Sequence, residues 1–166
     1  MRYIIGALFA FTLALVQASS VEQFHVMGVA PNLMLVLLVS WLVVRGLEDV
    51  LPMVAVAGIT IGFVGLQTPG LVLLAMLVPL AILGAVRELH VIHSELLLAL
   101  ALTGAATLMY ETIILLGVLA TGGVLDPAVS LREVIIPAAI VNVLLAPPVF
   151  AVMRLARPGP EQRFSF

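Results

Sequence analysis

The chain has 166 residues, of which 63% are hydrophobic and only 10% are charged, and its formal net charge is −2. A soluble domain carries about 25% charged residues, so this composition indicates an integral membrane protein. The sequence contains neither cysteine nor lysine, which excludes disulfides, thiolate metal sites, Schiff-base chemistry and a phosphate-loop lysine. The slightly acidic balance argues against nucleic-acid binding, which requires a basic surface.

Six apolar runs predict six membrane-spanning helices in a single domain. The runs cover residues 3–21, 29–44, 50–66, 71–86, 96–120 and 134–155, and a polar tail follows at residues 156–166. A helix of about 20 residues crosses the hydrocarbon core of a bilayer, so the runs account for most of the chain. Since no run alternates polar and apolar residues at period two, an all-α fold is favoured over a membrane barrel.

Small residues form stripes in the first and third runs. They recur every four positions, at Gly6, Ala10, Ala14 and Ala18 in the first run and at Gly58 and Gly62 in the third. Small residues at this spacing let another helix approach closely. The stripes are therefore candidate docking surfaces for the helix of a partner membrane protein, and packing inside the same bundle is the alternative.

Proline and charge predict the limits of the second and third runs. Pro31 and Pro52 each suit the first turn of a helix, where the missing N–H costs nothing. Trp41, near the end of the second run, is typical of an anchor at the membrane interface. We expect residues 47–49 to form a tight turn between the two helices.

The fourth run contains Pro79, which predicts a kink, and a polar loop follows it at residues 87–95. Within this loop, His90 and His93 are spaced so that two imidazoles could share one helix face and bind zinc. Only two histidine nitrogens are available as ligands, however, so we favour a solvated loop or a partner contact over a zinc site. We predict no metal, no cofactor and no enzymatic activity, because no catalytic motif is present.

The fifth and sixth runs contain the polar residues that lie deepest in the membrane. Glu111 is the one acid inside an apolar run, and Thr103, Thr107 and Glu111 share one helical face. Asn142 of the sixth run is expected at a similar depth, so a Glu111–Asn142 hydrogen bond is predicted. A carboxylate there is costly unless it is paired or protonated. It either fixes helix packing, binds a substrate or a proton, or contacts a partner subunit.

The arginines alternate between the two sides of the predicted membrane protein. If the N-terminus is cytoplasmic, one arginine, Arg132, lies outside, and the others lie on the cytoplasmic side: Arg2, Arg45, Arg87, Arg154, Arg157 and Arg163. Lys and Arg favour cytoplasmic loops. This bias predicts that both termini are cytoplasmic. A local ion pair with Asp126 or Glu133, or a periplasmic partner, could account for Arg132.

Two stretches resemble the MreD family of bacterial rod-shape proteins. The first is residues 30–41, APNLMLVLLVSW, continuing to Arg45 and Gly46, and the second is residues 141–150, VNVLLAPPVF, continuing to Arg154. Chain length, span count and the basic tail are also similar. The sequence departs from the family at residues 65–70, GLQTPG, where an acidic residue is common and none is present. No role of that acid carries over.

The resemblance implies a non-catalytic inner-membrane scaffold of the cell-elongation machinery, which builds peptidoglycan along the side wall. It implies MreC, a protein with one membrane helix, as partner. RodA and its transpeptidase would associate with MreC, and MreB filaments would lie on the cytoplasmic side.

The resemblance also implies a fold like that of the S subunits of energy-coupling-factor transporters. The alternative function is therefore a vitamin-binding S subunit, whose first helix packs a small-residue stripe like Gly6–Ala18 against a coupling subunit. The chain's two tyrosines and single tryptophan would furnish a vitamin cavity poorly.

Overall fold

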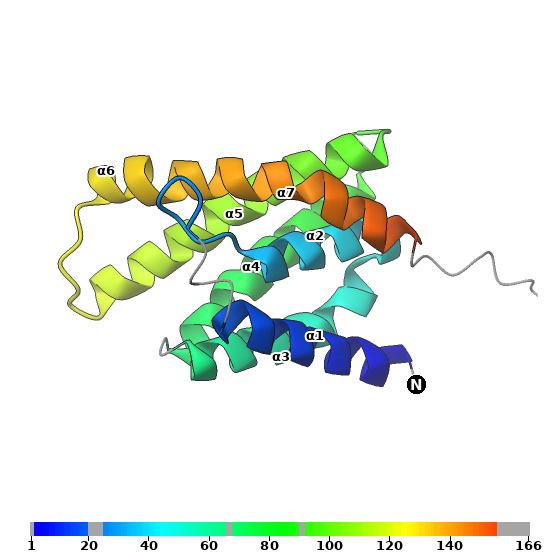
Figure 1. Cartoon of the computed structure of the whole chain (residues 1–166), viewed down its shortest axis with the longest axis horizontal. Helices are drawn as coiled ribbons and strands as arrows, with labels where there is room; N and C mark the ends of the chain where they lie inside the picture. The colour runs from blue at the N-terminus through cyan, green and yellow to red at the C-terminus, as the bar shows by residue number, and fades with distance from the viewer. Residues whose placement is uncertain (1, 20–24, 66–67, 90–91, 156–166) are drawn as a thin grey trace, which may run out of the picture.

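The computed structural model describes residues 2–19, 25–65, 68–89 and 92–155, and their regular structure is helical (Figure 1). The helices are α1 (Arg2–Ser19), α2 (Leu33–Arg45), α3 (Leu47–Val64), α4 (Pro69–Glu88), α5 (Glu95–Ala120), α6 (Pro127–Ser130) and α7 (Ile136–Leu155). A π-helical turn, η2 (Leu131–Ile135), joins α6 to α7. Within the described ranges the extended structure is limited to an isolated bridge between Val26 and Val29. The predicted all-α fold is confirmed.

Four helical segments are long and apolar enough to cross a membrane. They are α3, α4, α5 and the continuous segment Pro127–Leu155. The apolar helix α2 is shorter, with 13 residues. At about 1.5 Å per residue it rises about 20 Å, which is less than the hydrocarbon core of about 30 Å. The chain is therefore a helical membrane protein, and α2 itself is shorter than the hydrocarbon core is thick.

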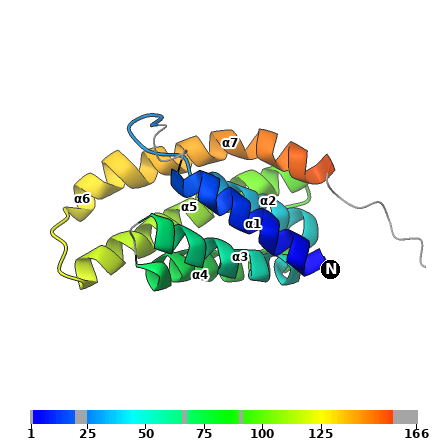
Figure 2. The ribbon, with the colours of Figure 1, turned by 60° about the horizontal axis from the view of Figure 1, so that its bottom comes forward.

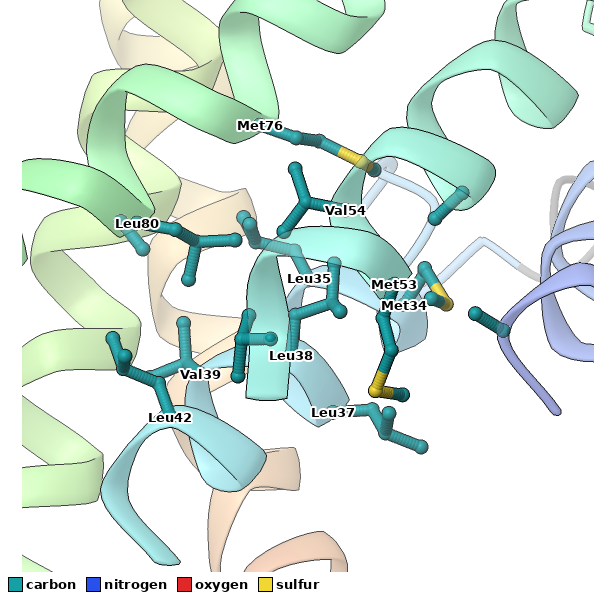
Figure 3. Packing of buried hydrophobic residues seen from close by; sticks show 14 of the residues in the cluster. Met34, Leu35, Leu37, Leu38, Val39, Leu42, Met53, Val54, Met76 and Leu80 are labelled. Carbon is teal, nitrogen blue, oxygen red and sulfur yellow. The ribbon is translucent and has the colours of Figure 1, made fainter. Parts of the chain in front are cut away.

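Helix α2 lies at the centre of the bundle, where α3, α4, α5 and α7 surround it and α1 touches it. Ten of its residues are buried, and they occupy all sides of the helix, which is typical of a helix enclosed by others. Figure 3 shows side chains of α2 packed against Met53 and Val54 of α3 and Met76 and Leu80 of α4. Figure 2 shows α1 crossing over α3 at the edge of the molecule.

The structure corrects the predicted start of the second helix. Residues 29–32 are not helical, and Pro31 lies before the helix rather than in its first turn. Asn32 is the N-cap, and its side-chain oxygen accepts a hydrogen bond from the Leu35 N–H. The preceding turn uses positive φ angles at Met27 and Gly28, which a helix cannot accommodate. The cap therefore fixes a later start than hydropathy indicated.

The predicted tight turn at residues 47–49 is also wrong. These residues form the first turn of α3, and a single residue, Gly46, separates α2 from α3. Gly46 adopts a φ of 97°, a conformation open to glycine and costly for other residues. Glu48 and Asp49 then lie in the first helical turn, where the helix dipole favours negative charge. Pro52 consequently lies inside α3.

The segment predicted as an outer loop before the last span is helical. Asp126 caps α6 by accepting hydrogen bonds from the N–H groups of Ala128 and Val129. Arg132 and Glu133 fall within η2 and are exposed. Among the described residues, Arg132 forms neither of the ion pairs considered from the sequence. The last helical segment therefore begins seven residues earlier than predicted.

The two small-residue stripes are used inside the chain's own bundle. Ala10 and Ala14 of α1 are fully buried, and α1 packs along α3. Gly58 and Gly62 face α4, and a Cβ added at Gly58 would lie 2.7 Å from the Leu73 Cα. Gly6 and Ala18 are partly buried. Packing inside the bundle, the alternative considered from the sequence, accounts for the buried members of the stripes, and docking of a partner helix at the stripes stays a prediction.

We predict that Gly58→Ala destabilises the protein, because the added methyl group meets the Leu73 backbone, which cannot rotate away. The free energy of unfolding in detergent should fall by about 1–2 kcal/mol, despite the better helix propensity of alanine. Gly70→Ala is the control, since a Cβ there has no neighbour within 4 Å. Equal stability of the two variants would contradict close packing of α3 on α4.

Candidate functional site

The start of α2 is partly buried in the bundle, and polar side chains from α1, α5 and α7 lie around it. A helix leaves its first N–H groups without partners in its own backbone. Inside a membrane, water is not at hand to satisfy them, and each unsatisfied group costs several kcal/mol. Side chains from α1, α7 and Asn32 itself supply the missing acceptors. We call this set of groups the α2 polar cluster: Gln17, Asn32, Thr107 and Asn142.

Gln17, near the end of α1, bonds to the backbone on both sides of Asn32. Its amide nitrogen donates to the Pro31 carbonyl at 3.0 Å, and its amide oxygen accepts from the Met34 N–H at 3.4 Å. The side chain is buried. Through these two bonds α1 is attached to the entry of α2, although α1 packs mainly on α3.

Asn142 of α7 is fully buried and connects three segments. Its side-chain oxygen accepts from the Asn32 N–H at 2.9 Å, and its amide nitrogen donates to the Thr107 hydroxyl of α5 at 3.2 Å. Thr107 in turn donates its own proton to the Thr103 carbonyl at 2.9 Å. The hydrogen bonds therefore form one chain, in which Asn142 and Thr107 each accept one bond and donate the next. The bonds of such a chain strengthen one another.

Glu111 lies one turn beyond Thr107 on α5 and lines a cavity beside the polar cluster. The cavity has a volume of about 140 Å³ and is bounded by Gln17, residues 30–32, Ile61 of α3, and Tyr110, Glu111 and Ile114 of α5. The predicted Glu111–Asn142 hydrogen bond is not among those of the described residues. Thr107 takes that place, because its hydroxyl is buried against Asn142.

The sequence pattern of threonines on α5 was informative, but it did not identify every member of the cluster. Thr103 and Thr107 are both fully buried, as their shared face with Glu111 indicated. Gln17 was not predicted, although a glutamine near the end of an apolar run is a sign of an internal hydrogen bond. Asn32 belongs to one of the stretches that resemble the MreD family, but its role as the N-cap of α2 could not be predicted without knowing where the helix begins.

The ionisable residues at one end of the bundle bind the helix ends together. Arg87 of α4 donates from Nε to the Val43 carbonyl in the last turn of α2, at 3.2 Å. Arg154 of α7 lies 4.0 Å from a carboxylate oxygen of Glu95 at the start of α5. Arg45 contacts Asp49 at 3.9 Å and lies over the Trp41 ring. This end is therefore polar, and the apolar core begins directly beyond it.

The histidine pair considered from the sequence cannot be placed as a site, because His90 lies outside the described residues. In the ranges that the structure describes, no three metal-ligating side chains of the His, Cys, Asp or Glu type come together.

Comparisons of the chain with protein-family models, curated proteins and solved structures find no match.

The hydrogen bonds of Asn142 predict energetic coupling with Thr107 and not with Glu111. Asn142→Leu leaves the Asn32 N–H without an acceptor, which should cost about 1–2 kcal/mol of unfolding free energy. Thr107→Val and Asn142→Leu together should cost clearly less than the sum of the two single changes, because both remove the same bond.

The control for this cycle is Thr112→Val, which removes an exposed hydroxyl that bonds only to its own helix. Thermal and denaturant unfolding in one detergent would supply all the values. Strict additivity of Thr107→Val with Asn142→Leu, or equal coupling with Glu111→Gln, would contradict the hydrogen bonding described here.

Proposed function

We propose that this chain is a non-catalytic membrane scaffold of the bacterial cell-elongation machinery and that it docks the membrane helix of an MreC-like partner. The observation that carries the proposal is the contact between the two stretches that resemble the MreD family. One stretch contains Asn32 and the other contains Asn142, and these residues are joined at 2.9 Å although 110 positions separate them. The resemblance therefore rests on residues that form one structural unit.

The alternative function, a vitamin-binding transporter subunit, receives less support from the cavity beside Glu111. Pockets for small molecules of drug size generally occupy about 300–1,000 Å³. This cavity has about 140 Å³, which is too little space for a vitamin. The scaffold proposal, which requires no vitamin-sized cavity, is therefore the better supported of the two.

We further propose six spans with both ends of the chain on the cytoplasmic side. The described helices run along one axis, and Figure 1 places the start of α1 and the end of α7 at the same end of the bundle. Arg45, Arg87 and Arg154 lie at that end, whereas Arg132 lies beyond the start of α7 at the other. The preference of arginine for the cytoplasm supports this orientation.

The outward face of α1 is the surface that we assign to the partner helix. Helix α1 lies at the edge of the bundle, packed on α3 and touching α2. Its other side exposes a band of large apolar side chains: Leu8, Phe9, Phe11, Leu15 and Val16. Phenylalanine rings there offer van der Waals contact, which drives helix association in lipid. RodA, its transpeptidase and MreB would then join through the partner.

The orientation predicts which positions an impermeant thiol reagent can reach in intact cells. The chain has no cysteine, so single substitutions give an unambiguous signal. Val124 and Leu155 are 99% and 87% exposed and lie at opposite ends of the last helical segment. Val124→Cys should react in intact cells, and Leu155→Cys should react only after the membrane is permeabilised. The reverse pattern would overturn the orientation.

The scaffold function predicts which protein can be crosslinked to α1 in the native membrane and purified with the chain. A photo-crosslinking residue at Phe11 on α1 should capture a single-span protein with a coiled-coil periplasmic part. The same residue at Leu144, which is 69% exposed on α7, is the matched control and should not capture it. Co-purification of an ATPase pair and a bound vitamin instead would show that the transporter alternative is correct.

A further inference from the structure

The cavity beside the α2 polar cluster has hydrogen-bond donors that are already occupied. The N–H of Asn32 is bonded to Asn142, that of Met34 to Gln17, and that of Leu35 to the Asn32 side chain. The amide nitrogen of Gln17 is bonded to the Pro31 carbonyl. These four donors are therefore taken, even though a helix N-terminus generally attracts negative charge.

The carboxylate of Glu111, by contrast, is an acceptor at the cavity without a hydrogen-bond donor among the described residues. Glu111 lines the cavity, and no hydrogen bond or ion pair joins its carboxylate to any residue in the described part of the chain. Glu111 lies nine residues before the end of α5, or about 14 Å along the helix axis, and so within the span rather than at its end. A carboxylate at that depth is costly unless it is paired or protonated, and a bound cation would supply the missing pair.

We propose that this cavity binds a cationic nitrogen group, an ammonium or a guanidinium, which donates hydrogen bonds to Glu111. The volume of about 140 Å³ equals that of about five water molecules in the liquid, which suits such a group on a short carbon stem. Tyr110 forms part of the same wall, and aromatic rings favour cations near them. The group could belong to a basic side chain of a partner helix or to a free organic cation.

This inference does not depend on the proposed scaffold function, because it concerns only the chemistry of the cavity. The test uses the purified full-length chain in detergent, with methylguanidinium chloride and methylammonium chloride as probes and sodium chloride at equal ionic strength as reference. At a probe concentration of about ten times the Kd, the midpoint of thermal unfolding should rise by about 3 °C. Glu111→Gln should abolish the rise.

Glu133→Gln is the matched control, because Glu133 is an exposed acid outside the cavity, and it should respond as the wild type does. If Glu111→Gln fails to fold, protection of Glu111 in the wild type from a hydrophobic carbodiimide, followed by mass spectrometry, gives the same answer. Saturating probe should slow that modification at least several-fold. Equal midpoints with probe and with sodium chloride in the wild type, or equal shifts in the wild type and Glu111→Gln, would overturn the proposal.

The same carbodiimide reaction distinguishes the two sources of the cation. If Glu111 is still protected in native membranes that have been washed free of small cations, and becomes reactive only after purification, a partner's basic side chain occupies the cavity. If Glu111 reacts in native membranes and only added probe protects it, the natural ligand is a free organic cation.

Discussion

The structure depends on one constraint: the first N–H groups of α2, a helix that begins inside the bundle, need hydrogen-bond acceptors. Helix α2 has only 13 residues, and its first N–H groups lie among apolar helices. An N–H group left unsatisfied within the hydrocarbon core costs several kcal/mol, so acceptors from the chain stabilise this helix start. They come from Gln17 in α1, Asn142 in α7 and the Asn32 cap. Satisfying one helix end therefore fixes the relative positions of segments far apart in the sequence.

The other helices are held around α2 by contacts of different kinds. Buried side chains surround α2 on all sides, while close approach of α3 and α4 depends on glycine at positions such as Gly58. Arginines close the opposite end of α2, where Arg87 bonds to the Val43 carbonyl. Both ends of the central helix are thus held by side chains from neighbouring helices. Within the described part of the bundle, the Thr103 hydroxyl and Arg45 Nε are buried without a hydrogen-bond partner, and the Glu111 carboxylate beside the cavity accepts no hydrogen bond either.

Hydropathy alone predicted the helical class and the approximate place of every long helix, because each is defined by a continuous apolar run. It could not place the start of α2, since the side chain that satisfies Met34 comes from Gln17 in another helix. The partner of Asn142 was likewise mistaken: similar depth made Glu111 plausible, but side-chain direction selects Thr107. The small-residue stripes were predicted as docking surfaces, with packing inside the bundle as the alternative. Only a three-dimensional arrangement could show that α3 and α4 lie against them.

Amide hydrogen exchange at Asn32 tests the central claim most directly, with the protein reconstituted in lipid. The N–H of Asn32 precedes the helix and has the Asn142 side chain as its acceptor. We predict slow exchange at Asn32 in the wild type and exchange at least about tenfold faster in Asn142→Leu, the factor expected for about 1.4 kcal/mol of lost protection. Fast exchange at Asn32 in the wild type, or unchanged exchange in the variant, would contradict the account.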